Sequence, residues 1–109
     1  MTKLTAFDIE FFELANILKG TIDENSKKII TKTLLKLNNP TYYSKWIRKN
    51  PIELHGFNST RTTNPVLLAI SSMLTALKTE SDAALLVKKL QTEFAWAFHK
   101  FNHYSSVNL

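Results

Sequence analysis

A chain of 109 residues lies near the commonest size of a single domain, so we expect one hydrophobic core and no second domain. Apolar residues make up 44% of the chain and charged residues 21%, which is typical of a globular protein and excludes a disordered one. Cysteine is absent, which excludes disulfides and thiolate metal sites. The net charge of +5 favours acidic partners.

The N-terminus and the apolar runs indicate neither secretion nor a membrane segment. Residues 1–5 lack the basic, apolar and small-residue pattern of a signal peptide. The longest apolar stretch, residues 66–77, contains Ser71, Ser72 and Thr75 and falls short of the ~20 residues that span a bilayer. We therefore expect a cytoplasmic protein with no membrane partner.

The fold class follows from the scarcity of glycine and from the helix signals. Only Gly20 and Gly56 are present, whereas sheet proteins of this size usually need more turn glycines. We predict an all-α, single-domain bundle of four to five helices with short loops. The expected helices cover about residues 5–19, 23–38, 40–49, 65–78 and 82–104, with a loop at 56–64 and a loose tail at 105–109.

The first expected helix has a capping box and one strong apolar face. Thr5 and Asp8 have the capping-box spacing, and Gly20 suits the C′ position. One face repeats large apolar residues: Phe7, Phe11, Leu14 and Leu18. Three more lie off that face: Ile9, Phe12 and Ile17. Their presence predicts a helix that is buried on more than one side.

The second expected helix is amphipathic. Its inward face consists of Ile30, Leu34 and Leu37 beside Ile29. Its other face carries Lys27, Lys28, Lys32 and Lys36. This pattern is typical of a helix that covers a core and presents its lysines to solvent.

Three Asn-Pro pairs predict helix starts, with asparagine as the N-cap and proline at N1. They are Asn39-Pro40, Asn50-Pro51 and Asn64-Pro65. The first begins a short helix that turns Tyr42 and Trp46 toward the core, with Tyr43 as a further candidate. The third begins the apolar helix.

The last expected helix carries a heptad-like seam. Ser81 or Thr79 is the expected N-cap, and Asp82 suits the positive end of the helix dipole. The seam consists of Ala83, Val87, Leu90, Phe94, Ala97 and Phe101. Three residues lie off it and either pack against a second neighbour or form an exposed surface: Leu86, Trp96 and Phe98. Trp96 and Tyr104 are the candidate interface residues.

Positive charge is concentrated in the middle of the chain. Residues 25–61 hold eight basic side chains and one carboxylate, Glu53. These basic residues are the candidate nucleic-acid or anion-binding site: Lys27, Lys28, Lys32, Lys36, Lys45, Arg48, Lys49 and Arg61. Such a segment attracts phosphates because bound counterions are released on contact. It also suits an acidic protein surface, or it is simply a solvated face.

The same region resembles a helix-turn-helix in outline, because a turn at residues 38–40 precedes a short basic helix. The exposed residues of that second helix would be Thr41, Ser44, Lys45, Arg48 and Lys49. Hydroxyl and basic side chains suit contacts with phosphates.

An arginine and a histidine separated by six residues, Arg48 and His55, form the only pattern that indicates an enzyme. The pair resembles the Arg-x(4–6)-His motif of HEPN ribonucleases, which are small helical domains. That resemblance implies RNA cleavage, with His55 as general base and Arg48 stabilising the phosphate charge. The sequence departs from the family pattern at Lys49 and at Pro51.

His99 and His103 are four residues apart on one helix face, about 6 Å along the axis, and form a candidate partial metal site. No third ligand is evident on that face, so local hydrogen bonding is the preferred interpretation. The sequence also shows no nucleophile elbow and no phosphate-binding glycine loop. We expect no cofactor and no enzyme activity.

These observations leave several hypotheses. The first is a non-catalytic binding or regulatory module of the kind that mobile elements encode, which contacts nucleic acid through residues 27–61. The alternatives are an interaction module that binds an acidic protein or forms a homodimer through its last helix, and a HEPN-like ribonuclease. Small basic helical bundles are also similar in outline to the cytosolic immunity proteins of bacteriocin producers, an analogy of architecture alone.

Overall fold

The computed structural model describes residues 4–49 and 64–107, with side chains described for residues 4–46 and 64–102. Within these ranges the chain forms five α-helices and no strand, which confirms the all-α prediction. The helices are α1 (Ala6–Lys19), α2 (Glu24–Leu37), α3 (Pro40–Lys49), α4 (Pro65–Thr79) and α5 (Ala83–Val107).

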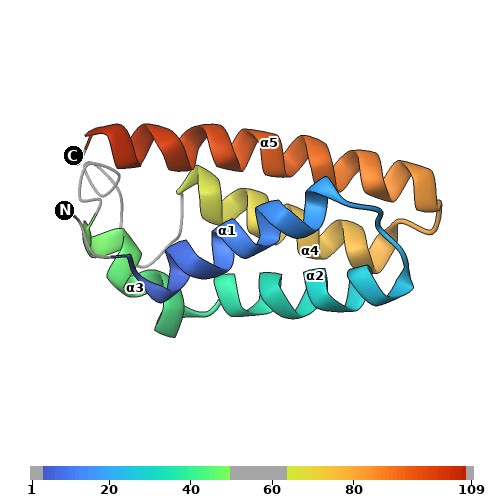
Figure 1. The fold of residues 1–109 in the computed structure, drawn as a ribbon, viewed down its shortest axis with the longest axis horizontal. Helices are drawn as coiled ribbons and strands as arrows, with labels where there is room; N and C mark the ends of the chain where they lie inside the picture. The colour runs from blue at the N-terminus through green and yellow to red at the C-terminus, as the bar shows by residue number, and fades with distance from the viewer. Residues whose placement is uncertain (1–3, 50–63, 108–109) are drawn as a thin grey trace.

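Four helices form a bundle, and α3 lies at one end of it (Figure 1). In this view α5 runs along the top and α2 along the bottom, and α1 passes in front of α4 between them. Helices that follow each other through short turns, α1 with α2 and α4 with α5, run in opposite directions. This order places α2 and α5 on opposite sides of the bundle.

Side-chain caps fix the starts of the helices. The Thr5 hydroxyl oxygen accepts from the Asp8 backbone N–H at 3.2 Å, and Asp8 Oδ2 accepts from the Thr5 N–H at 2.6 Å, which confirms the capping box. Asn64 Oδ1 accepts from the backbone N–H groups of Val66 and Leu67. Asn39 Oδ1 accepts from the Thr41 N–H at 2.9 Å. Two of the Asn-Pro signals are therefore confirmed, and Asn50-Pro51 lies outside the described residues.

Two helix ends differ from the sequence predictions. Asp82 caps α5, because its Oδ1 accepts from the Leu85 N–H at 2.9 Å, so the prediction of Ser81 or Thr79 was wrong. The Thr79 hydroxyl instead donates to the Thr75 carbonyl within α4. The α5 helix continues to Val107, so residues 105–107 are helical rather than part of a loose tail.

Gly20 ends α1 as predicted but in a different conformation. Its backbone is extended, with φ of −92°, rather than left-handed as at a typical C′ glycine. A Cβ built on Gly20 would meet only the Ile17 carbonyl oxygen, at 3.8 Å. The helix therefore ends here without needing the conformational freedom of glycine.

The centre of the core is a cluster of aromatic rings from three helices. The ring centroids of Phe11 and Phe101 are 4.4 Å apart, and those of Phe7 and Trp46 are 4.5 Å apart. Trp46, which is 2% exposed, also stacks on Phe101 at 5.8 Å. These contacts join α1, α3 and α5. They confirm that α3 turns Trp46 toward the core.

Several predicted core positions are exposed instead. Ile9 and Phe12 on α1 are 56% and 40% exposed, and Ile29 on α2 is 44% exposed. The prediction that α1 is buried on more than one side was therefore wrong for Ile9 and Phe12. Ile9 is the more exposed of the two, and Phe12 stays exposed although its ring meets that of Phe101 on α5 edge-to-face.

Of the three residues off the α5 seam, two pack against the core and one forms an exposed surface. Leu86 is buried at 2% exposure, and Phe98 is half-buried against the core. Trp96 is 51% exposed and forms part of the surface. Within the seam, the later residues are buried: Leu90, Phe94, Ala97 and Phe101. Val87 is half-buried and Ala83 is exposed.

Candidate binding surfaces

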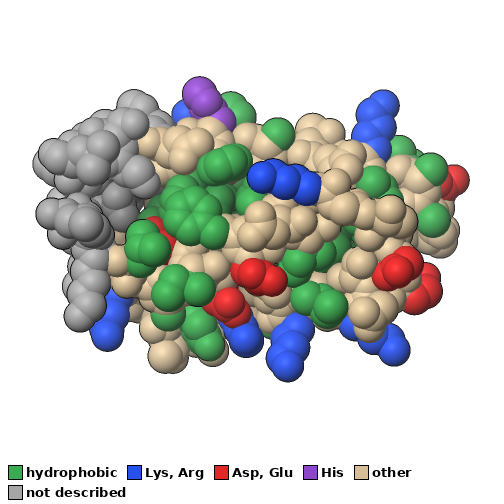
Figure 2. Space-filling view, in the orientation of Figure 1, with side chains coloured by type: hydrophobic (Ala, Val, Ile, Leu, Met, Phe, Trp, Pro, Cys, Tyr) green, Lys and Arg blue, Asp and Glu red, His purple; other side chains and the backbone are tan. Residues whose placement is uncertain are grey.

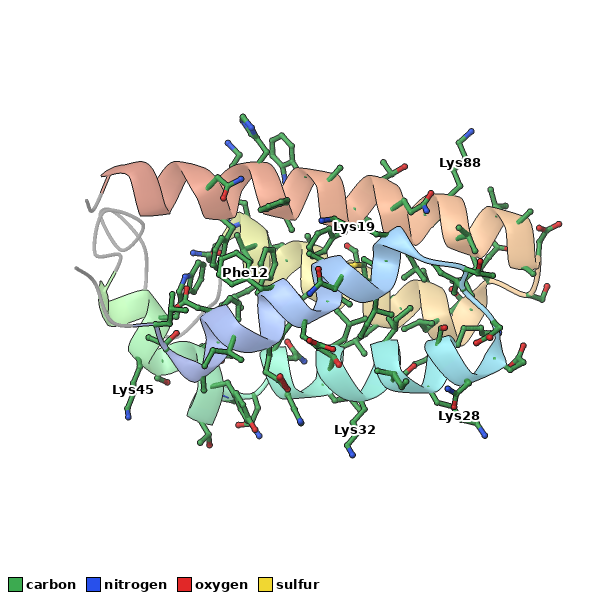
Figure 3. All side chains as sticks on the ribbon, viewed as in Figure 1. Phe12, Lys19, Lys28, Lys32, Lys45 and Lys88 are labelled. Carbon is green, nitrogen blue, oxygen red and sulfur yellow. The ribbon has the colours of Figure 1, made fainter. Side chains whose placement is uncertain are left out.

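Three exposed lysines form what we call the basic edge: Lys28 and Lys32 on α2, and Lys45 on α3. All three point outward along the same lower edge of the bundle in Figure 3. Lys28 and Lys32 are one helical turn apart, about 6 Å along the axis. None of the three forms an ion pair with another residue in the described part of the chain.

Two other lysines of α2 are neutralised by neighbouring carboxylates. Lys36 Nζ lies 2.9 Å from Glu10 Oε1 of α1, and Lys27 Nζ lies 3.2 Å from Glu24 Oε1. The hydrogen bond to Glu10, together with its negative charge, raises the pKa of Lys36 above the usual 10.5. The free positive charge of α2 is therefore confined to its outer side. Figure 2 shows the acidic side chains just above the basic ones.

A shallow groove of about 420 Å³ separates α2 from the C-terminal part of α4, and we call it the α2/α4 groove. It adjoins the basic edge and combines lysines with exposed apolar side chains. Its lining is Glu24, Lys27, Lys28, Thr31, Lys32, Leu35 and Leu77. Leu35 is 56% exposed, so the groove offers carbon surface as well as charge.

The structure does not describe the remaining basic candidates. Arg48 and Lys49 lie within α3, but their side chains are outside the described set, and Arg61 lies outside the described residues. Of the expected outer residues of the helix-turn-helix outline, Thr41 and Lys45 are exposed and Ser44 is half-buried.

The candidate chemical sites are only partly visible. Arg48 is placed in α3 by its backbone alone and His55 lies outside the described residues, so their separation is not defined. His99 is exposed on α5, with its ring 6.4 Å from that of Trp96. The side chains of His103 and Tyr104 are outside the described set. Among described side chains, no three of His, Cys, Asp and Glu gather as metal ligands.

A second groove, also of about 420 Å³, runs between α4 and α5, and we call it the α4/α5 groove. Its α4 wall is built from small side chains: Ser72, Thr75, Ala76 and Thr79. Its α5 wall consists of Leu85, Lys88, Lys89, Thr92 and Glu93. The serine and threonines that interrupt the apolar pattern of residues 66–77 were the sequence signal for this groove, but that signal alone does not distinguish a groove wall from a solvated face.

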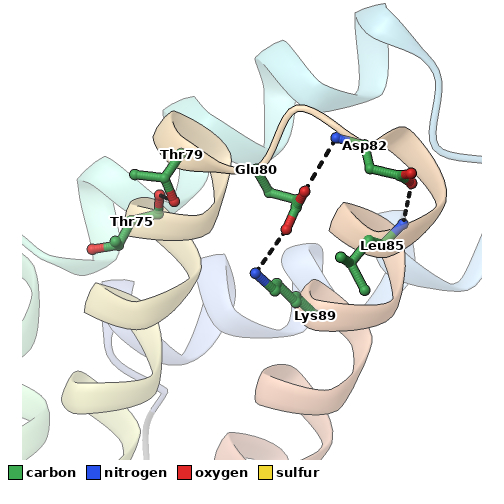
Figure 4. A network of polar contacts seen from close by, with 6 residues as sticks. All are labelled: Thr75, Thr79, Glu80, Asp82, Leu85 and Lys89. Atoms are coloured by element: carbon green, nitrogen blue, oxygen red, sulfur yellow. Dashed lines mark hydrogen bonds and ion pairs between the residues drawn. The ribbon is translucent and has the colours of Figure 1, made fainter.

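An ion pair braces the end of the α4/α5 groove (Figure 4). Glu80 accepts from Lys89 Nζ at 2.8 Å through one carboxylate oxygen and from the Asp82 N–H at 3.2 Å through the other. These hydrogen bonds lower the pKa of Glu80 below its usual 4.5, and the bond from Lys89 has the larger effect. The turn between α4 and α5 is thereby tied to the second turn of α5.

Trp96 continues the α5 wall by one further turn. Its indole is half-exposed, and the Lys100 ammonium lies over it at 4.7 Å from the ring centroid. An exposed tryptophan is the residue type most enriched at interface hot spots. Of the two predicted interface residues, the structure therefore places Trp96 beside a groove.

No known protein family, curated protein or solved structure matches this chain. Across the described helices, none has the length and apolar character required to cross a membrane.

Proposed function

We propose that this protein is a non-catalytic binding module that contacts nucleic acid through the basic edge. The observation that carries the proposal is that Lys28, Lys32 and Lys45 share one edge and have no ion-pair partner among the described residues. An exposed, unpaired ammonium group keeps its full charge for a phosphate.

The expected contacts are electrostatic and largely independent of sequence. Lysine ammonium groups neutralise phosphates and release the counterions condensed on the duplex. Such contacts position a protein on nucleic acid but do not read bases. For three contacts on duplex DNA, the logarithm of the binding constant should fall with the logarithm of salt concentration with a slope of about −2.7.

The test is fluorescence anisotropy of a labelled DNA duplex and of a labelled RNA between about 50 and 200 mM salt. Lys28→Gln/Lys32→Gln should weaken binding and make the salt slope shallower by about 1.8, because two phosphate contacts are lost. Lys19→Gln/Lys88→Gln removes the same charge from exposed lysines away from the basic edge (Figure 3) and should leave most of the affinity. Absence of binding at low salt, or equal losses in both variants, would refute the proposal.

An acidic protein surface is the second candidate partner. The observation that favours it is Leu35, which is 56% exposed within the α2/α4 groove although a phosphate backbone needs no apolar contact. An acidic amphipathic helix would use both the leucine and the lysines. Leu35→Ser should weaken binding of an acidic amphipathic model peptide and leave nucleic-acid affinity unchanged. Equal peptide affinity in wild type and variant would exclude the α2/α4 groove as the binding site of the peptide.

A further inference from the structure

The corner between α2 and α3 holds the two helices of the basic edge in a fixed relation. Only Asn38 and Asn39 lie between the two helices. The Asn38 N–H donates to the Leu34 carbonyl at 2.9 Å, and Asn39 Oδ1 accepts from the Thr41 N–H at 2.9 Å. This short, hydrogen-bonded turn sets the direction in which α3 leaves the line of α2 (Figure 1). The lysines of the two helices therefore meet a ligand as one unit.

The inner side of α3 anchors this helix to the core. Trp46 is 2% exposed and stacks on rings of α1 and α5. Tyr42 and Tyr43 on the same helix are half-buried. Among its described side chains, α3 thus has no fully exposed ring on which a base of a single strand could stack. The side chains that it exposes instead are Thr41 and Lys45.

The outer side of α3 suits a helix that lies against a nucleic-acid duplex. Thr41 and Lys45 are four residues apart on one helix face, about 6 Å along the axis. A short hydroxyl side chain lets the helix backbone come close to the edges of base pairs. A lysine beside it is long enough to reach a phosphate at the border of the groove.

The lysines of α2 lie where they can contact the strand beside α3. Lys32 is five residues before the end of α2 at Leu37, about 8 Å along the axis, and Lys28 is one turn further. Neither has an ion-pair partner among the described residues. In a helix-turn-helix the second helix occupies the major groove and the first crosses the phosphate backbone. The two ammonium groups are placed for the second of these contacts.

We propose that the nucleic acid is duplex DNA and that α3 lies in its major groove, with Thr41 toward the base edges and Lys45 toward the phosphates. This inference rests on the proposed function, whose site it specifies. An α-helix with its side chains is about 10–12 Å in diameter, which fits the major groove of B-form DNA and exceeds the minor groove of about 6 Å. The major groove of A-form RNA is too deep and narrow for side chains to read.

The first test compares a DNA duplex with an RNA duplex of the same sequence and length by fluorescence anisotropy at one salt concentration. The two duplexes carry the same number of phosphates, so the comparison isolates the shape of the groove. The DNA duplex should bind at least about tenfold more tightly, the value of roughly one groove contact.

The failure of this inference is distinct from that of the proposed function. An RNA duplex or a single DNA strand that binds as tightly as the DNA duplex would overturn the placement of α3 and leave the basic edge as a nucleic-acid site. Absence of binding to all three would refute both.

The second test places a negative charge on the outer side of α3. Thr41→Glu should weaken binding of the DNA duplex at least about tenfold, because a carboxylate in the groove is repelled by the phosphates on both sides. Thr92→Glu makes the same change at an exposed position of α5, on the side of the bundle opposite α2, and should retain most of the affinity. Equal losses in the two variants would overturn the placement of α3. Glutamate suits the first turn of a helix, and circular dichroism checks that α3 still forms.

The third test identifies the groove by competition and needs no variant. A dye that binds the major groove, such as methyl green, should displace the protein from the DNA duplex. A ligand of the minor groove, such as netropsin, should leave it bound. Displacement by netropsin, or none by methyl green, would overturn the inference.

Discussion

The α5 helix packs against α4 and against α1 in two different ways. The contact with α4 is the most extensive helix contact in the described bundle, and the buried residues of the two helices there include small ones, Ala69, Ala76 and Ala97, beside larger aliphatic ones such as Ile70, Met73 and Leu90. Toward α1 the contact is aromatic, because Phe11 meets Phe94 and Phe101 with ring centroids 5.0 and 4.4 Å apart.

The comparison also shows where stability is concentrated. The α4/α5 contact is spread over many aliphatic groups along both helices. The α1/α5 contact depends on a few rings, each of which touches several others. We therefore expect opposite sensitivities: the aromatic side should fail when a side chain is made smaller, and the alanine side when one is made larger.

The largest expected effect is that of Phe11→Ala. Phe11 is fully buried and its ring contacts those of Phe94, Phe98 and Phe101, so truncation leaves a cavity between α1 and α5. We expect a loss of about 3–5 kcal/mol in the free energy of unfolding, measured by urea denaturation.

Phe12→Ala is the matched control for Phe11→Ala. Phe12 is 40% exposed and has one edge-to-face contact, with Phe101 at 5.5 Å, so the loss should be about 1 kcal/mol. Equal losses in the two variants would mean that the aromatic cluster does not hold α1 to α5.

The next largest effect should come from enlarging the alanine side. Ala97 is fully buried, so Ala97→Leu overfills the core beside α5 and should cost about 1–3 kcal/mol in the same measurement. Ala95→Leu adds the same side chain at an exposed position of α5 and should change stability by at most about 0.5 kcal/mol. If Ala97→Leu proved stabilising, the core around Ala97 would not be closely packed.

The smallest effect concerns the ion pair that braces the α4–α5 turn. Because the folded state lowers the pKa of Glu80 below 4.5, the carboxylate contributes stability above that pH and loses it as the pH falls through the lowered value. We expect Glu80→Gln to lower the melting temperature slightly at pH 7, and the difference from wild type to vanish in acid. A difference that persists at pH 2 would contradict the ionic origin.

The ion pair between Lys36 and Glu10 should lose its contribution to stability in base, whereas that of Glu80 is lost in acid. The pKa of Lys36 is raised above 10.5, so its contribution is complete below that pH and is lost as the pH rises through the raised value. Lys36→Gln should therefore differ from wild type at pH 7 and converge with it only in strong base.

The local features of the fold were predictable because their partners are close in sequence. The Thr5 and Asp8 capping box and the Asn64 cap each join groups within three residues. The start of α5 was mistaken because Thr79, Ser81 and Asp82 are all capping residue types, and only the path of the turn decides among them. Amphipathic spacing likewise predicted an inner face but not which neighbours would leave Phe12 exposed.

The surfaces were less predictable, because they depend on residues far apart in the chain. The sequence identified the lysines of α2 as one charged face. It did not show that Lys36 forms an ion pair with Glu10, because that pair depends on the packing of α1 against α2. The α4/α5 groove combines Thr75 on one helix with Thr92 on another, and the hydroxyl residues of α4 alone do not indicate that a second wall lies opposite them. The residue type of Trp96 made it an interface candidate, but the sequence did not predict that it lies beside a groove.

The contrast between the two tryptophans has a practical consequence. Trp46 is 2% exposed among the core rings and Trp96 is 51% exposed on α5, so the intrinsic fluorescence of the chain has two sources in opposite environments. A soluble quencher such as iodide should reach the indole of Trp96 and spare that of Trp46 while the protein is folded. Emission that resists iodide thus reports on the folded interior and the quenchable part on the surface of α5, and both can be read from one unlabelled sample.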